Sequence, residues 1–322
     1  MLQACAGTQN RYILTTGFSR NEIFRVGRLT CTRQEMLVYL VNAAKRYDAI
    51  FQGTDPEAFA FDETGGLTET IRESTLALAG QIKAMQLLAE ETGILPEAEE
   101  LEKCAACAAA YYATLTEADL IALDHVSQET IRAMYEEILV ATRVYEYAVR
   151  DVNPEISDDE ARTITVEVLR IGKRDNPASA LALAQEAQKM LEDGEDFAAV
   201  QPLYNESETE RLTFGTGETE DFPEEEAFSL ETGEVSGILE TESSYYILRC
   251  VSAFDRQATR ANKERIVRMR RNEAFGELYD AFVEGLPVQL NTGAWEALEI
   301  PDGEDLTSGF WDTYELFFGE DS

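Results

Sequence analysis

Apolar residues recur at helical spacing through the first half of the chain. After a short polar lead, residues 22–31 read as two short strands around Gly27, and helices are predicted over residues 32–51, 68–93, 96–115 and 127–150. The clearest apolar stripe follows the second of these helices, at alternating intervals of four and three residues. It consists of Ile71, Thr75, Leu78, Ile82, Met85 and Ala89. These patterns predict a helical region that extends to about residue 155.

The ends of these helices carry residues that commonly begin and end helices. Thr32 and Glu35 match the Ser/Thr-x-x-Glu capping box, Pro96 suits a first turn, and Ser127 suits an N-cap position. Gly93 is a typical helix stop. The end signals therefore agree with the apolar stripes.

After residue 155 the pattern becomes a mixture of strands and helices. Residues 206–226 are polar, are interrupted by Gly215 and Gly217, and predict a loop. The other predicted elements are a strand at 164–171, a helix from Asn176-Pro177 to Gly194, a short helix at 196–203, and strands at 237–240 and 245–251. This order predicts an α+β module.

A long helix is predicted from Arg256, basic in its first half and apolar in its second half, where Phe275 and Tyr279 lie. Because the apolar half needs a core, we expect it to pack on the N-terminal helical region. The predicted fold class is therefore multidomain α+β, with a helical domain built from both chain ends and the α+β module inserted between them. The predicted boundaries are 1–21 for a lead and linker, 22–155 for the helical domain, 156–255 for the module, and 256–322 for the returning helix and tail.

Two features of the C-terminal region have alternative interpretations. The basic half of the long helix either faces the protein's own carboxylates or forms a docking surface. The acidic tail at 301–322 either docks as an amphipathic turn or serves as a free binding motif. Its aromatic residues are Phe310, Trp311, Tyr314, Phe317 and Phe318.

Charge narrows the classes of partner. The 322 residues suffice for two or three domains, and 27 Lys and Arg against 62 Asp and Glu give a net charge of -35. Such a field repels phosphate backbones and anionic headgroups, so nucleic acid is not an expected partner. The acidic surface is either simply solvated or attracts basic partners.

The N-terminus resembles a bacterial lipobox, in which a small residue precedes a cysteine that becomes lipidated. The segment is Leu2-Gln3-Ala4-Cys5, without the charged and apolar regions of a signal peptide ahead of it. The sequence contains no run of about 18 apolar residues, so no membrane span is predicted. Either the match arises by chance, or the chain is a secreted lipoprotein that lacks its signal and is tethered through a lipid on Cys5.

The cysteines and the single histidine predict neither a metal site nor a cofactor site. Cys104 and Cys107 have redox spacing, but they lie in an Ala/Glu-rich helical run, whereas a thioredoxin-type motif follows a strand. A metal site needs further soft ligands, and the chain has one histidine, His125. Both cysteines are therefore predicted to be small buried helix residues.

Three segments of the module together resemble parvulin-type peptidyl-prolyl isomerases. They are Ala-Arg-Thr-Ile-Thr-Val at 161–166, Gly-Glu-Asp-Phe-Ala at 194–198, and Ala-Phe-Ser-Leu-Glu-Thr-Gly-Glu-Val-Ser at 227–236. The third is the most specific, because parvulins typically show Ala-x-Phe-x-Leu-x-x-Gly-Glu-Val-Ser before their last hairpin. The order of helical domain, module and returning basic helix is similar to that of the PrsA and SurA foldases.

The resemblance also implies where a site lies. Parvulins carry two histidines that hydrogen-bond each other, at positions occupied here by Thr163 and Tyr246. Either a Thr163–Tyr246 hydrogen bond replaces that pair, since both hydroxyls donate and accept, or the isomerase activity is weak or lost. The other implied site residues are Ser207 at the catalytic position and Thr219, Phe222 and Phe228 as substrate contacts.

By this resemblance the chain is expected to be an extracytoplasmic foldase or chaperone that binds unfolded or partly folded secreted polypeptides. The lipobox-like start favours the surface of a Gram-positive bacterium, with membrane contact only through the lipid anchor. The alternatives are an active prolyl isomerase and a scaffolding surface lipoprotein. The oligomeric state stays open, with a dimer as one option.

Overall fold

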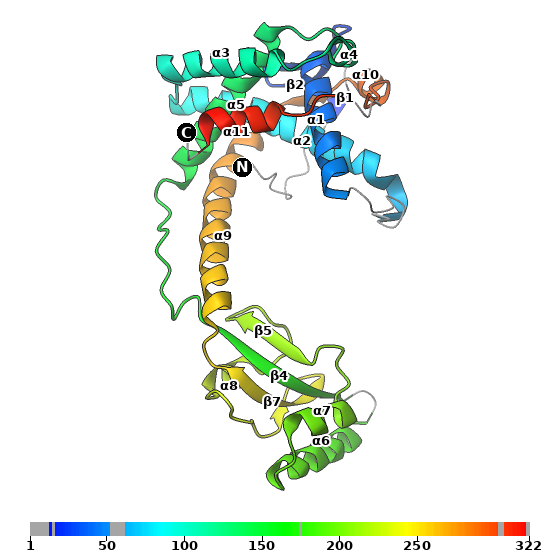
Figure 1. Cartoon of the computed structure of the whole chain (residues 1–322), viewed down its shortest axis with the longest axis vertical. Helices are drawn as coiled ribbons and strands as arrows, with labels where there is room; N and C mark the ends of the chain where they lie inside the picture. The colour runs from blue at the N-terminus through cyan, green and yellow to red at the C-terminus, as the bar shows by residue number, and fades with distance from the viewer. Residues whose placement is uncertain (1–12, 15–16, 52–61, 174–175, 302–305, 320–322) are drawn as a thin grey trace. The chain divides into compact units, whose positions relative to one another are not determined.

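The computed structural model describes residues 13–14, 17–51, 62–173, 176–301 and 306–319. Within these residues the fold is α+β, as predicted, with two four-stranded sheets among the helices (Figure 1). The chain divides into two compact units. Unit 1 comprises residues 1–151 and 272–322, and unit 2 comprises residues 152–271. Helix α9 (Arg256–Val283) therefore contributes its first half to unit 2 and its second half to unit 1.

The sheet of unit 1 joins the two ends of the chain. Its strands, in spatial order, are β1 (Ile13–Leu14), β8 (Val288–Leu290), β2 (Glu22–Val26) and β3 (Leu29–Thr32). β2 and β3 form the predicted hairpin, with Gly27 in its turn at φ 56°. The left-handed φ is the reason that glycine suits this turn; a Cβ there would also lie 2.9 Å from Leu87 Cδ1, the end of a flexible side chain that could shift. Because β8 lies between β1 and β2, the sheet needs the C-terminal segment to be complete.

Five helices of the N-terminal segment build most of unit 1: α1 (Arg33–Phe51), α2 (Asp62–Thr92), α3 (Ala98–Tyr112), α4 (Glu117–Ala122) and α5 (Gln128–Val149). The predicted capping box is present, since the Glu35 backbone N–H donates to Thr32 Oγ1 and the Thr32 backbone N–H donates to Glu35 Oε2. Glu97, rather than Pro96, immediately precedes α3. Helix α4 was not predicted, because six residues are too few to show a periodic stripe.

The aromatic tail docks into the core of unit 1 through α11 (Phe310–Phe318). Phe310 is fully buried, and its ring stacks on Tyr135 with 4.5 Å between ring centroids. The Tyr135 hydroxyl donates to the Phe310 carbonyl oxygen over 2.8 Å, and Asn42 Oδ1 accepts the backbone N–H groups of Gly309 and Phe310. The docked arrangement, rather than a free binding motif, is therefore the one found. The second half of α9 joins the same core, where Phe275 is buried.

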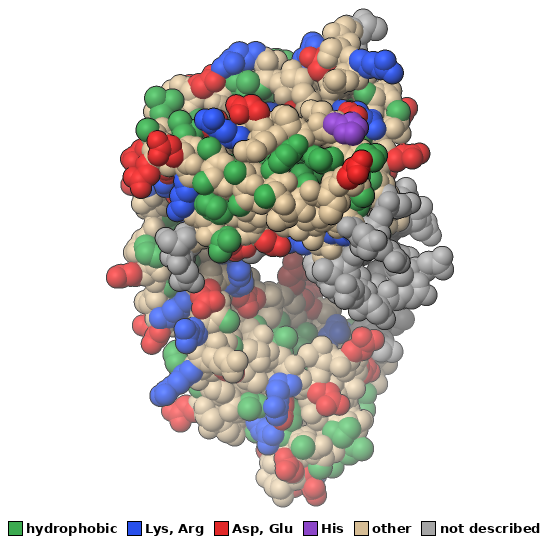
Figure 2. Space-filling model, turned by 45° about the horizontal axis from the view of Figure 1, so that its top comes forward, with side chains coloured by type: hydrophobic (Ala, Val, Ile, Leu, Met, Phe, Trp, Pro, Cys, Tyr) green, Lys and Arg blue, Asp and Glu red, His purple; other side chains and the backbone are tan. Residues whose placement is uncertain are grey.

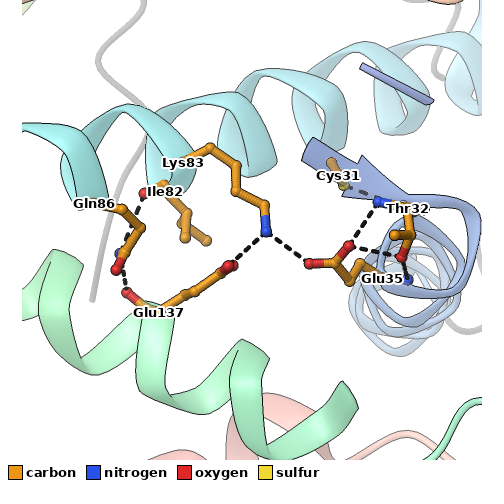
Figure 3. Close-up of polar contacts among 7 residues, drawn as sticks. All are labelled: Cys31, Thr32, Glu35, Ile82, Lys83, Gln86 and Glu137. Carbon is orange, nitrogen blue, oxygen red and sulfur yellow. Dashed lines mark hydrogen bonds and ion pairs between the residues drawn. The ribbon is translucent and has the colours of Figure 1, made fainter. Parts of the chain in front are cut away.

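A buried cation connects three helices of unit 1 (Figure 3). Lys83 Nζ of α2 donates to Glu35 Oε1 of α1 over 2.7 Å and to Glu137 Oε1 of α5 over 2.6 Å, and Lys83 is 4% exposed. Burial lowers the pKa of Lys83, but the two carboxylates raise it by more, so the net pKa lies above the ordinary value. Burial also raises the pKa of Glu137, which Lys83 opposes. Glu137 Oε2 is buried and has no hydrogen-bond partner among the described residues.

Unit 2 is built on a sheet whose two faces are covered differently. Its elements are β4 (Thr163–Gly172), α6 (Pro177–Glu192), α7 (Phe197–Tyr204), β5 (Arg211–Gly215), α8 (Glu224–Ser229), β6 (Leu239–Glu240) and β7 (Ser244–Ser252). The spatial order is β5-β4-β7-β6, with antiparallel neighbours. One face buries Leu169 and Ile247 under α6 and α7. The other face buries Val166 and Leu248 with apolar residues of β5 and α8.

Strand β5 and the start of α8 lie in the stretch predicted to be a loop. The apolar residues of β5 are Leu212 and Phe214, which is too short a pattern to stand out among the surrounding carboxylates. Its hydrogen bonds come from β4, where Thr165 pairs with Thr213 and Val166 pairs with Leu212. Residues 211–215 form a strand because they pair with β4, a distant segment, and the local sequence pattern does not encode such pairing.

The basic half of α9 faces carboxylates of unit 2 only in part. Lys263 Nζ lies 2.6 Å from Asp158 Oδ1, and two further ion pairs join Arg265 to Glu218 and Arg270 to Glu160. The other arginines of this half are exposed and form no ion pair with any residue that the structure describes: Arg256, Arg260, Arg268 and Arg271. On the face drawn in Figure 2, acidic and basic side chains are interspersed.

Candidate functional site

A pocket of about 310 Å³ lies in unit 2, on the sheet face that α8 covers. This volume is near the lower end of the roughly 300–1,000 Å³ typical of ligand pockets, so it suits a ring or side chain with its adjoining backbone. The apolar lining consists of Val168, Leu212, Phe222 and Tyr246. The polar lining consists of Arg170, Ser207, Thr209, Glu220 and Asp221.

The register between β4 and β7 forms the floor of the pocket. Arg170 lies directly opposite Tyr246, and Val168 lies opposite Leu248. Since side chains alternate along a strand, these four residues point to the same face of the sheet. The next segment is held against the free side of β4: Asn205 Oδ1 accepts the Arg170 backbone N–H over 2.9 Å. This hydrogen bond holds the segment that carries Ser207 and Thr209 beside β4, and both residues lie at the rim of the pocket.

Aromatic contacts form the apolar wall. The rings of Phe222 and Tyr246 meet edge to face with 5.2 Å between centroids, and Phe214 contacts Phe222 in the same way, also at 5.2 Å. Tyr246 is 6% exposed, and its hydroxyl donates to the Asp221 carbonyl oxygen over 3.1 Å. Burial raises the pKa of Tyr246, an effect that the nearby positive charge of Arg170 opposes. The hydroxyl is therefore neutral and already has an acceptor.

The loop that carries Phe222 is tied to the turn before β7. Asp221 has φ 46°, a backbone conformation that Asp tolerates better than most residues. Its carboxylate accepts a hydrogen bond from the Ser243 hydroxyl and, over 3.1 Å, one from the Glu242 backbone N–H. These hydrogen bonds, led by that of Ser243, hold the pKa of Asp221 below its ordinary value. The pocket wall is thus fixed by a charged residue of its own rim.

Arg170 is the one cation among the residues that line this pocket. Its Nε donates to Ser244 Oγ over 2.9 Å, and Ser244 is fully buried. Neither Glu220 nor Asp221, the two carboxylates of the rim, forms an ion pair with Arg170 in the described part of the chain. The guanidinium is therefore held by the neutral hydroxyls of Ser244 and Tyr246, and it has further N–H donors that neither of them occupies.

Three of the sequence-predicted site residues meet in this pocket: Ser207, Phe222 and Tyr246. Phe228 lies outside the lining and packs on Phe214, with 5.6 Å between ring centroids. Thr219 also lies outside it, and its hydroxyl is buried without a partner among the described residues. Cys5 lies outside the described residues.

Of the two alternatives drawn from the resemblance, the Thr163–Tyr246 hydrogen bond is not the one found, because both hydroxyls donate elsewhere. Thr163 Oγ1 donates to the Ala161 carbonyl oxygen over 3.1 Å, whereas the Tyr246 hydroxyl donates to Asp221. Thr163 precedes Arg170, the partner of Tyr246, by seven residues along β4, which is roughly 23 Å of strand. The residue opposite Tyr246 is therefore Arg170, which sequence reasoning missed. The available signal was a charged residue at an inward position of a strand that is otherwise apolar on that face.

Cys104 and Cys107 are buried helix residues, as predicted. Cys104 and Cys107 are both buried in α3, and burial raises the pKa of each to about 12. No group of three or more His, Cys, Asp or Glu side chains within the described ranges could hold a metal ion. Across the same ranges, no helix combines the length and the apolar character that crossing a membrane requires.

No protein-family model and no curated protein matches the chain. Among solved structures, it is similar to the peptidylprolyl isomerase PrsA from Bacillus cereus, at 16% identity and a TM-score of 0.37, over 80% of this chain and 98% of that chain. It is also similar to the foldase protein PrsA from Streptococcus pneumoniae, at 14% identity and a TM-score of 0.33, over 80% and 97% of the two chains.

A SurA-like chaperone structure from Campylobacter jejuni matches at 13% identity and a TM-score of 0.30, over 84% of this chain and 99% of that chain. The likeness to PrsA and SurA-like proteins that the sequence motifs predicted thus recurs among solved structures. At these identities and TM-scores, it assigns no role to any single residue of this chain.

Proposed function

We propose that this protein is an extracytoplasmic foldase or chaperone that binds unfolded or partly folded polypeptides. The observation that carries the proposal is the pocket of unit 2, where aromatic walls and a polar rim meet on the sheet face that also packs Ala227 and Leu230 of the motif at 227–236. Such a lining suits a small apolar ring and the backbone next to it. Because the pocket holds one segment of an extended chain, binding would be transient and tolerant of sequence.

We further propose that prolyl isomerase activity is weak or lost. Rotation about a prolyl peptide bond takes tens to hundreds of seconds unaided, and a catalyst must favour the twisted amide over the planar one. In this pocket the Tyr246 hydroxyl already donates to Asp221, and the residue opposite it is a permanently charged arginine. Neither group offers the paired, neutral hydrogen-bonding that the histidines of parvulins provide.

The proposed setting follows from charge and from the N-terminal motif. A net charge of -35 favours basic segments of unfolded clients, and the effect should weaken as salt rises. A lipid on Cys5 would tether the protein to a Gram-positive membrane from outside the cell. No oligomeric state is part of the proposal.

The test is suppression of client aggregation. The full chain is mixed at stoichiometric ratio with a chemically unfolded basic protein, and light scattering is followed after dilution of the denaturant. We expect slower aggregation, and a smaller effect for Phe222→Ala, which removes part of the pocket wall. Leu203→Ala is the matched control, because Leu203 is exposed and lies outside the pocket. Unchanged scattering with several unfolded clients would refute the chaperone proposal.

An active isomerase is the second candidate, favoured by the aromatic wall of Phe222 and Tyr246, which suits a proline ring. It predicts that the wild-type chain accelerates the cis-to-trans relaxation of a proline peptide. It also predicts that Tyr246→Phe or Arg170→Met reduces this acceleration. Absence of acceleration together with suppression of aggregation would favour the chaperone.

A further inference from the structure

We infer that the guanidinium of Arg170 binds a main-chain carbonyl oxygen of the polypeptide segment held in the unit 2 pocket. The inference rests on the proposed function, because it names the chemical group that the pocket recognises. It makes Arg170 the residue that positions the bound backbone, while the aromatic wall holds the adjoining side chain.

The first support is the unused hydrogen-bonding capacity of Arg170. A guanidinium has five N–H donors, and the partners found for Arg170 among the described residues are two neutral hydroxyls, those of Ser244 and Tyr246, which leaves donors for a ligand. Other cations on the same sheet have carboxylate partners: Arg211 and Arg249 both pair with Glu167, and Lys173 pairs with Glu240. In a chain with 62 acidic residues, an arginine that lines a pocket without an ion pair is set apart from these cations.

The second support is a contact of the same type elsewhere in unit 2. Arg162 Nε donates to the Ala253 carbonyl oxygen over 3.0 Å, and its Nη2 donates to the Phe228 carbonyl oxygen over 3.2 Å. The arginine also lies over the Phe228 ring, 5.5 Å from its centroid. Arg162 thus holds backbone carbonyls beside an aromatic ring. Arg170, with Phe222 and Tyr246 in the same lining, presents a comparable set of groups to a ligand.

The charge of the rim favours a neutral acceptor over an anion. Glu220 and Asp221 line the same pocket and are exposed, so a carboxylate or phosphate ligand would meet two like charges. A carbonyl oxygen carries only a partial charge and avoids most of this repulsion. Since the walls are apolar, the ligand that fits has an apolar group next to a neutral acceptor, as every polypeptide segment does.

This contact also bears on prolyl rotation. The planar amide places partial negative charge on its oxygen through conjugation, and twisting removes that charge. A cation at the oxygen of the X–Pro bond therefore stabilises the planar form more than the twisted one. Arg170 would strengthen binding without speeding rotation, which agrees with a pocket that holds clients rather than isomerising them.

The experiment titrates the full chain with the blocked neutral peptide acetyl-Ala-Ala-Pro-Phe-amide and follows amide chemical shifts. We expect Arg170→Met to weaken binding about tenfold or more, as for loss of a hydrogen bond to a charged group. Arg260→Met is the matched control, because Arg260 is exposed on α9 and lies outside the pocket, and its affinity should equal that of wild type. Thermal unfolding of each variant checks that unit 2 remains folded.

Peptides that carry one thioamide each, a weaker acceptor than an amide, test the contact without altering the protein. At one position the thioamide should weaken binding to wild type but not to Arg170→Met. If no thioamide weakens binding to wild type, the inference is wrong, even where Arg170→Met fails to fold. Equal affinities of wild type and a folded Arg170→Met would also overturn it, while peptide binding by the pocket would stand.

Two other results separate the inference from the proposed function. No binding of the peptide by wild type would overturn both. Tighter binding of a peptide with Asp before Pro, with this preference lost in Arg170→Met, would instead assign Arg170 to a carboxylate and overturn the carbonyl assignment.

Discussion

Each unit contains a cation next to its core, and the two cations differ in their partners: one is paired with carboxylates and the other is not. In unit 1, Lys83 is buried between the carboxylates of Glu35 and Glu137 (Figure 3). In unit 2, Arg170 lines a pocket and is held by the Ser244 hydroxyl, a neutral group. Lys83 therefore has charged partners within its own unit, whereas Arg170 has donors left over.

The difference separates a residue that supports the fold from one that is free to bind. A buried charge that loses its partners costs several kcal/mol, so the Lys83 network is expected to govern stability. A partly exposed guanidinium at a pocket costs little when it is removed, so Arg170 is expected to govern binding instead.

Lys83→Met should have the largest effect. It leaves two buried carboxylates without their cation, which is expected to lower the free energy of unfolding by about 3–5 kcal/mol. Denaturant unfolding followed by far-UV circular dichroism measures the loss. Arg260→Met, an exposed charge change, should stay within about 0.5 kcal/mol of wild type. Equal losses for the two variants would show that the Lys83 network contributes no more to the free energy of unfolding than an exposed arginine does.

Placing histidines across the β4–β7 pair tests the register assignment. Arg170→His with Tyr246→His puts both imidazoles opposite each other and removes the permanent charge. We expect prolyl peptide isomerisation to accelerate about tenfold over wild type, or about 1.4 kcal/mol in the barrier. The control is Thr163→His with Tyr246→His, where the two positions are far apart along the strand. Comparable acceleration by the control would mean that residue 170 is not the partner that matters.

Tyr246→Phe should produce a smaller loss confined to unit 2. The change removes the hydrogen bond to the Asp221 carbonyl oxygen but keeps the ring contact with Phe222. A loss of about 0.5–1.5 kcal/mol in the free energy of unfolding is expected. Tyr147→Phe, at an exposed tyrosine of unit 1, is the control and should change little. A wild-type value for Tyr246→Phe would show that this hydrogen bond does not hold the pocket wall.

The dependence of unit 1 stability on pH should show the smallest effect. Burial raises the pKa of Glu137 above its ordinary 4.5, so the folded protein holds that proton more tightly than the unfolded chain does. The contribution of Glu137 to the free energy of unfolding is thus fully present below pH 4.5 and is lost as the pH rises from there through the raised folded pKa. The difference between wild type and Glu137→Gln, measured by denaturant unfolding, should decrease over that interval. A difference that is constant with pH would contradict the raised pKa.

The sequence predicted most of the helical elements and only part of the site. Helix ends such as the Thr32 and Glu35 capping box are local signals, because both partners lie within one turn. Ser207, Phe222 and Tyr246, which the family resemblance assigned to one site, line the same pocket. Thr163 was misplaced, because assigning it required the register between two strands more than 70 residues apart in sequence. Arg170 was missed for the same reason.

The amino-acid sequence by itself determined the helical stripes of unit 1, the strands of the β6–β7 hairpin and the acidic character of the surface. These properties depend on residue type and short-range spacing, which the chain order states directly. Tertiary structure alone decided that β8 completes the sheet begun by β1 and β2, that Phe310 enters the core, and that Arg170 faces Tyr246. Each of these contacts joins distant segments, and only the packing of the folded chain selects among the many pairings that local patterns allow.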